Sequence, residues 1–257
     1  MYDVDGDREP LSDPSLFDHS RYLEIGAALY GEYGIRDRLT LVGYLPFKVV
    51  EFEGEGSAGE SNGEDAGFGD LHLGARLQLL RRGSWRAALE PDLKLPLYTV
   101  DDDRGEFVPV LGSGFVDFAV GLSVGASIPA ANGYLQGSVG YRVRGGSTGE
   151  EWYQALEGGL EPWRGLRARL RFDAVDSEDV GHGVVGMVDE ANAPVPEAGG
   201  QDYERIAPTL AAALGQAGEI SVTWRGIVDG RNTAISSEWE VAFTFMGRFL
   251  PAASAAP

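Results

Sequence analysis

Residues 166–174 read Leu-Arg-Ala-Arg-Leu-Arg-Phe-Asp-Ala, with an apolar side chain at every second position. Side chains of a β-strand point alternately to opposite faces, so the leucines and Phe172 would share one face and the arginines the other. The same alternation recurs in four further stretches, at residues 70–79, 85–97, 115–128 and 238–248. The chain is therefore predicted to consist of strands that each have one apolar and one polar face.

Three further features favour a membrane barrel over a soluble sandwich. The alternating stretches reach ten or more residues, whereas soluble strands average about 5–6. Their polar faces carry large side chains of both charges, which suits a water-filled interior. Aromatic residues lie near the expected strand ends, where a bilayer has its interfaces; they include Tyr44, Trp85, Tyr98, Tyr134, Trp152 and Trp163.

The connections are expected to alternate in length. Short turns are predicted near residues 34–37, 81–84, 129–133, 162–165 and 215–218, and longer links at 51–67, 99–111, 145–150, 177–201 and 229–233. In outer-membrane barrels the short turns are periplasmic and the long loops extracellular. The long links hold much of the chain's acid, including Asp101, Asp102 and Asp103.

The strand count leads to an expectation about the start of the barrel. About eleven strands fit between Arg21 and Arg248, and the first connection is a short turn, so the first strand would descend from outside. Single-chain bacterial barrels have an even number of strands, and an unpaired edge is costly in lipid. We therefore expect a twelfth strand upstream of Met1, with residues 1–10 or 180–190 as the alternative source.

Composition excludes several classes of protein. The 257 residues suffice for one large all-β domain, and no stretch approaches the ~18 consecutive apolar residues of a transmembrane helix. The chain has no cysteine, which excludes disulfides and thiolate chemistry, and its net charge of -19 argues against nucleic acid. The start, Met1–Gly6, is polar and lacks the apolar segment of a signal peptide.

Three stretches carry a resemblance to a known family: GEYGIRDRLTL at 31–41 with Leu45-Pro46-Phe47, GFGDLHLGAR at 67–76 with Leu95-Pro96, and GSGFVD at 112–117. In this order, over residues 20–248, the chain resembles outer-membrane β-barrels of the "putative MetA-pathway of phenol degradation" family, which are transporter-like. The resemblance implies a barrel with a further strand before the matched region and no catalytic residues. The acidic, glycine-rich residues 51–67 depart from the family pattern and leave the ligand open.

The polar faces supply the candidate site. Five arginines face the predicted lumen (Arg142, Arg144, Arg167, Arg169 and Arg171), together with acids that include Asp70, Glu90, Asp92, Asp117, Glu157 and Asp173. The arginines could attract anionic or aromatic solutes and set selectivity. Alternatively, they form a charge network with the acids that fills a narrow barrel, and the two roles are compatible.

Other motifs are interpreted as structural. Gly67-Phe68-Gly69-Asp70 precedes a strand and lacks the Lys and Ser/Thr of a phosphate loop. Asp101–Asp103 and the acids of 51–65 could bind calcium, but a solvated loop face is favoured because no EF-hand spacing is present. His72, His182 and Asp18-His19 show no catalytic or metal-binding pattern, so no enzyme, cofactor or metal is expected.

Together these observations predict an all-β, antiparallel up-and-down transmembrane barrel of about 12 strands in the bacterial outer membrane. Its expected parts are an N-terminal loop segment at 1–20, the barrel at 21–249 and a tail at 250–257. The expected function is passive uptake of small, hydrophobic or aromatic solutes, with membrane lipid and the solute as partners. The alternatives are a structural or surface-interaction barrel without transport and a soluble ligand-binding barrel.

Overall fold

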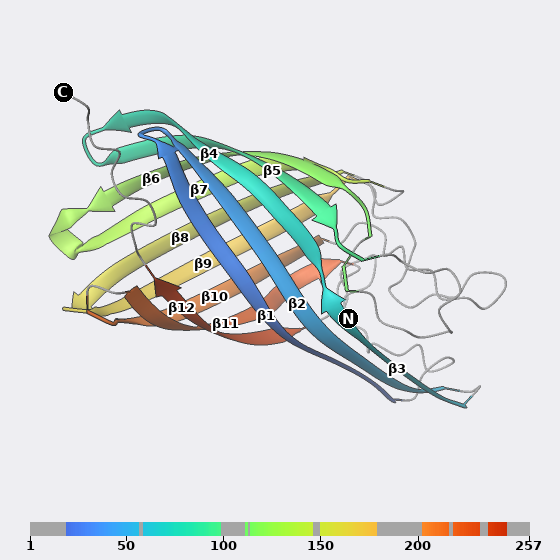
Figure 1. Cartoon of the computed structure of the whole chain (residues 1–257). Coiled ribbons are helices and arrows are strands. Elements are labelled where there is room, and N and C mark those ends of the chain that lie inside the picture. The colour runs from blue at the N-terminus through green and yellow to red at the C-terminus, as the bar shows by residue number, and fades with distance from the viewer. Residues whose placement is uncertain are drawn as a thin grey trace, which may run out of the picture.

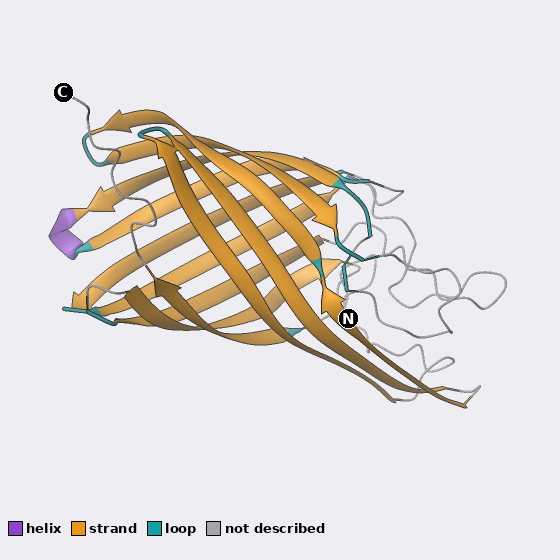
Figure 2. Ribbon diagram, viewed as in Figure 1, coloured by secondary structure: helices purple, strands orange, loops and turns teal. Residues whose placement is uncertain are grey.

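The protein is all-β. The computed structural model describes residues 19–56, 59–98, 111–112, 114–145, 150–178, 202–215, 218–231 and 236–245. Its strands are β1 His19–Arg36, β2 Leu39–Gly56, β3 Gly59–Phe68, β4 Asp70–Arg82, β5 Trp85–Pro96, β6 Asp117–Ile128, β7 Gly133–Val143, β8 Glu151–Trp163, β9 Leu166–Ser177, β10 Asp202–Ala213, β11 Gly218–Arg231 and β12 Ser237–Phe245. The helical structure in this part of the chain is one 3₁₀ turn, Pro129–Ala131 (Figure 2), and no helix there could cross a bilayer.

The strands form one antiparallel sheet that curls on itself (Figure 1). Neighbours follow chain order except at β3 and β4, which both pair with β2. β4 pairs with the first part of β2 and β3 with the second, so the two strands together follow the single course of β2. The prediction of an antiparallel up-and-down β-barrel fold is confirmed, and eleven positions around the sheet match the expected number of visible strands.

The predicted long link at residues 51–67 is wrong. Instead of a loop, β2 continues to Gly56 and β3 pairs with it from Gly56↔Gly59 to Phe47↔Phe68, so the hairpin projects past the rest of the described sheet (Figure 1). Sequence periodicity does not predict this hairpin, because hydrogen bonds between the two backbones can form without an apolar face on either strand. From Gly54 on, the acidic and glycine-rich residues show no alternation of apolar and polar side chains.

The short turns lie where they were predicted and gather at one end of the sheet, on the left in Figure 1. Gly83 and Gly165 adopt φ values of 56° and 82°, a left-handed conformation that glycine adopts without strain. The strand ends that flank the longer links lie at the opposite end (Figure 1), and residues 99–110, 146–149, 179–201 and 232–235 themselves are outside the described part of the chain. The prediction that the short turns lie together at one end of the barrel is confirmed.

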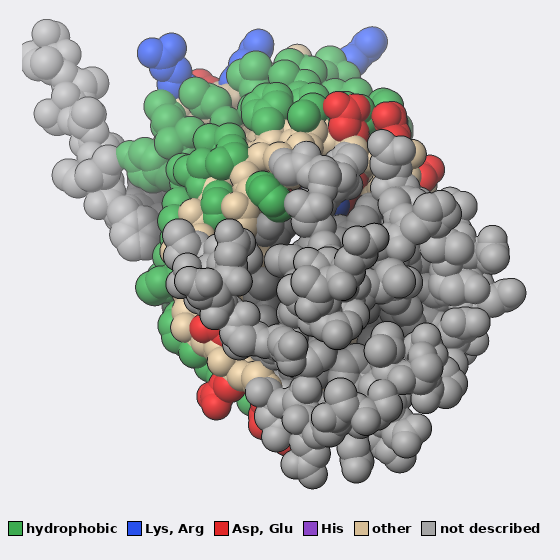
Figure 3. Space-filling view, turned by 90° about the vertical axis from the view of Figure 1, so that its right-hand side faces the viewer, with side chains coloured by type: hydrophobic (Ala, Val, Ile, Leu, Met, Phe, Trp, Pro, Cys, Tyr) green, Lys and Arg blue, Asp and Glu red, His purple; other side chains and the backbone are tan. Residues whose placement is uncertain are grey.

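The sheet has its apolar face outside. Large hydrophobic side chains on this face are exposed, for example Leu29 at 74% and Phe243 at 60%. The buried apolar residues in the described part of the chain are mostly alanines. Viewed from the loop end, hydrophobic side chains cover much of the visible outer wall (Figure 3). Within the described residues, these outward apolar side chains, which we call the outer belt, remain exposed.

The first and last strands of the sheet are edges. Within the described residues, β1 pairs only with β2, and β12 only with β11. The predicted twelfth strand stays a prediction. Its alternative sources, residues 1–10 and 180–190, lie outside the described part of the chain, as do residues 1–18 and 246–257 of the expected terminal segments.

Candidate functional site

The inward face of the sheet carries the charged residues. The pleat places alternate residues on this face, and the same alternation puts the belt outside. Charged side chains on the inward face form ion pairs across neighbouring and next-but-one strands. This charged inner wall, which we call the lumen wall, is the candidate functional site.

All five predicted arginines lie on the lumen wall in ion pairs. Arg142 of β7 and Arg144, which follows this strand, both form ion pairs with Glu151 of β8. The nitrogen–oxygen distances are 2.8 Å for Arg142 and 2.7 Å for Arg144. Arg171 bonds Asp173 at 2.7 Å and approaches Glu157 at 3.9 Å. The structure thus places these residues in a charge network.

Arg167 and Arg169 of β9 reach across β10 to Glu219 of β11, at 2.8 and 3.0 Å. The intervening strand presents the small Ala211, which is 2% exposed, at the position opposite Arg167. A small residue here leaves room for the arginine side chains to lie along the wall. Glu219 was not among the predicted partners.

The predicted acids also find partners, mostly on β4 and β5. Arg76 bonds Glu90 at 2.9 Å and Glu32 at 3.1 Å. His72 lies 2.9 Å from Asp92, and its ring contacts Tyr44 edge-on.

A compact charged cluster lies where β4 begins, β5 ends and β6 begins. Lys94 is 8% exposed and lies 2.5 Å from Asp117 and 3.3 Å from Asp70. The backbone N–H of Gly145 donates to Asp117 at 3.1 Å. Lys94 was not predicted as a site residue, although its position among inward-facing acids on the same face could have indicated it.

Next to this cluster, a short segment after the 99–110 link lies against the wall. Leu111 is 4% exposed and packs so closely on Gly67 that an added Cβ there would lie 2.8 Å from it. The Gly114 N–H donates to the Tyr98 hydroxyl at 2.7 Å. Burial, with the nearby Asp70 carboxylate, raises the pKa of the Tyr98 phenol.

Two tyrosine rings are pressed against the lumen wall over glycines. Tyr153 covers Gly140 and Gly121, and a Cβ at Gly121 would lie 2.8 Å from its hydroxyl. Tyr134 covers Gly159 in the same way and donates a hydrogen bond to Glu157. Glycine at these positions lets the rings lie along the wall. Tyr44, Tyr98 and Tyr134 were expected at the bilayer interfaces, but they take part in these inward contacts instead.

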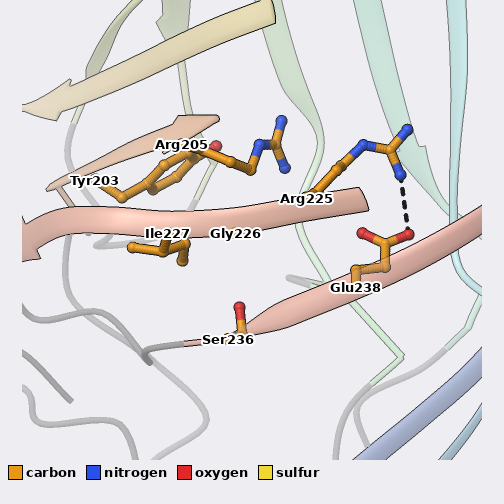
Figure 4. Close-up of a pocket in the computed structure, with 7 residues that line it drawn as sticks. All are labelled: Tyr203, Arg205, Arg225, Gly226, Ile227, Ser236 and Glu238. Atoms are coloured by element: carbon orange, nitrogen blue, oxygen red, sulfur yellow. Dashed lines mark hydrogen bonds and ion pairs between the residues drawn. The ribbon is translucent and has the colours of Figure 1, made fainter. Parts of the chain in front are cut away.

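A cavity of about 200 Å³ lies on the lumen side of β10–β12, near the ends that lead to the long links. It is lined by Tyr203, Arg205, Arg225, Gly226, Ile227, Ser236 and Glu238 (Figure 4). Neither Arg205 nor Arg225 was predicted as a site residue. Both side chains face inward. Which residues lie beside them depends on the register between β10, β11 and β12, and the sequence does not reveal this register.

In the described part of the chain, no three His, Asp or Glu side chains gather as a metal site would require. The calcium candidates Asp101–Asp103 lie outside the described residues, as do His182 and Asp18. Several acids of the 51–65 run lie in the β2–β3 hairpin instead of a loop.

Comparisons with known proteins agree with this architecture. The fold is similar to that of an outer membrane channel from Pseudomonas putida F1, with a TM-score of 0.58 and 12% sequence identity over 84% of this chain and 79% of that one. No curated protein sequence matches the chain significantly. The model of the family described as "Putative MetA-pathway of phenol degradation" matches residues 17–165. The chain therefore belongs to this family.

Proposed function

We propose that the chain is a bacterial outer-membrane channel through which small solutes pass passively along the charged lumen wall. The observation that carries this proposal is the inverted distribution of side chains: apolar and exposed outside, charged and paired inside. Contact with lipid would cover the outer belt, and water would solvate the inner wall. The similarity to a channel from Pseudomonas putida supports the same arrangement.

A soluble ligand-binding barrel is disfavoured by this distribution. A soluble barrel keeps a polar surface in contact with water, because large contiguous apolar patches promote association. Here the outward faces of β6 and β7 expose Val120, Leu122 and Val139 by 39–47%. Such a surface in water would drive aggregation.

The interior of the sheet favours a channel over a structural barrel without transport. Tyr153 and Tyr134 are held along the wall instead of across the lumen. Inward positions next to the ion pairs hold small residues such as Ala119 and Ala207. These features keep bulky side chains near the wall and support passage, and the tyrosines favour small solutes with an aromatic part.

The test is solute entry into liposomes that contain the folded protein, with arabinose as the probe. Ala155 and Leu156 are neighbours near the middle of β8, and Leu156 points outward with 52% exposure. We expect Ala155→Trp, which places an indole ring in the lumen, to slow arabinose entry, and Leu156→Trp to leave entry unchanged. Absence of entry through the folded wild-type protein would refute the channel and favour the structural barrel.

A further inference from the structure

The cavity between β10 and β12 is lined by both charged and apolar side chains. Arg205 and Tyr203 come from β10, Arg225 and Ile227 from β11, and Glu238 from β12 (Figure 4). β11 lies between the other two strands, so the β10 side chains and Glu238 line opposite sides of the cavity. Each side has a distinct chemical character.

Arg205 is incompletely partnered, although its side chain is only 33% exposed. Its ion pair in the described part of the chain is with Asp173, at 3.5 Å, and Asp173 is already held at 2.7 Å by Arg171. The Arg205 Nε–H is buried and has no hydrogen-bond acceptor among the described residues. Buried donors in native proteins almost always have a partner, so the Arg205 guanidinium keeps hydrogen-bonding capacity that an incoming acceptor can use.

The apolar part of the cavity lies beside this donor. The guanidinium of Arg205 stacks over the ring of Tyr203, with 5.7 Å between the guanidinium carbon and the ring centroid. Ile227 adds an aliphatic surface from the adjacent strand, in register with Arg205. A ligand with a flat apolar body would find contacts here that a sugar would not use.

On the opposite side of the cavity, the positive charge of Arg225 is already paired with carboxylates. Arg225 donates to Glu238 at 3.0 Å and to Glu240 at 2.8 Å, and the Glu238 side chain is 61% exposed. An anion would therefore lie toward Arg205, and the Glu238 carboxylate would oppose it.

We propose that this cavity binds a small aromatic carboxylate, whose carboxylate pairs with the Arg205 guanidinium while its ring packs on Tyr203 and Ile227. The inference rests on the proposed channel function, because such a ligand reaches the cavity through the lumen. It names a solute class for that channel and a site at which the solute pauses during passage.

The direct test is calorimetric binding of benzoate to the detergent-folded protein, with benzyl alcohol as the uncharged comparison. We expect benzoate to bind more tightly than benzyl alcohol, and Arg205→Gln to weaken benzoate binding by about tenfold, as expected for loss of one charge-assisted hydrogen bond. Equal binding of the two ligands, or unchanged benzoate binding by Arg205→Gln, would overturn the proposal.

The matched control is Arg86→Gln, which removes one inward positive charge at the short-turn end of β5. Arg86 is exposed and donates to the backbone carbonyls of Gly83 and Trp85, so these contacts leave no carboxylate without its partner when Arg86 is replaced. We expect this variant to bind benzoate like the wild type. Equal weakening by both variants would mean that only the overall charge matters and would overturn the site.

A second variant keeps the test valid if Arg205→Gln does not fold. Glu238→Gln removes the opposing charge from an exposed position, and we expect it to tighten benzoate binding several-fold. A merely structural role of Glu238 predicts no gain, and unchanged or weaker binding by this folded variant would count against the proposal. Arabinose entry into liposomes separates the two claims: entry without benzoate binding refutes only the site, whereas benzoate binding without any entry refutes only the channel.

Discussion

At the scale of single residues, the lumen wall depends on charges that are held in pairs. Pairs with little solvent contact, such as Lys94 with Asp117, differ in their energetics from exposed ones, such as Lys48 with Glu24. Removing one member of a buried pair leaves a charge without compensation, whereas an exposed pair contributes little.

Replacing Lys94 with methionine should therefore destabilise the fold strongly. Its side chain is 10% exposed and lies between two acids, so we expect a loss of about 3–5 kcal/mol in the free energy of unfolding. Lys48→Met is the control and should cost less than about 1 kcal/mol, because that pair is exposed. Urea unfolding in lipid vesicles measures both, and equal effects would show that the Lys94 cluster is not a buried anchor.

The contact between Tyr153 and Gly140 makes a second residue-level prediction. Gly140→Ala would place a methyl group where the ring now lies, so we expect a loss of about 1–2 kcal/mol in the free energy of unfolding. Tyr153→Ala should abolish this penalty in the double variant. An additive result in the double-mutant cycle would mean that the ring does not lie on Gly140.

At the scale of elements, the strands and turns could be predicted, but one hairpin and most ion-pair partners could not. Alternation in residues 166–174 predicted β9, and the turn at Gly165 predicted where it begins, although the strand continues to Ser177. The β2–β3 hairpin was missed because its acidic residues lack apolar periodicity. Pairs such as Arg167 with Glu219 were missed because they depend on the register of three strands.

The face assignment of each strand can be tested with adjacent lysine substitutions in β7. Val139 points outward and is 47% exposed, so Val139→Lys would place a charge in lipid and should cost about 2–4 kcal/mol near the midplane. Ser138→Lys places the same side chain on the opposite, inward face and should cost much less. The measurement is folding into vesicles followed by urea titration, and a reversed order of the two variants would invert the proposed faces.

At the scale of the whole molecule, the curled sheet separates an apolar exterior from a charged interior. Family membership and the likeness to a solved structure agree with the curled sheet. The sequence predicted the division because alternation is a local property of each strand. It did not predict the cavity at Tyr203 and Arg205, because that cavity depends on how strands far apart in the chain are placed around the sheet.

The most direct test of the central claim uses the absence of cysteine from the chain, which makes any introduced cysteine unique. Single cysteines would replace Gln136 and Ser138, which face the lumen, and Leu135 and Val139, which face outward. With the protein in lipid vesicles, we predict that a charged, water-soluble thiol reagent modifies the two inward positions rapidly and the two outward positions slowly. Equal reaction at all four positions, or faster reaction at the outward pair, would contradict a membrane channel with a water-filled lumen.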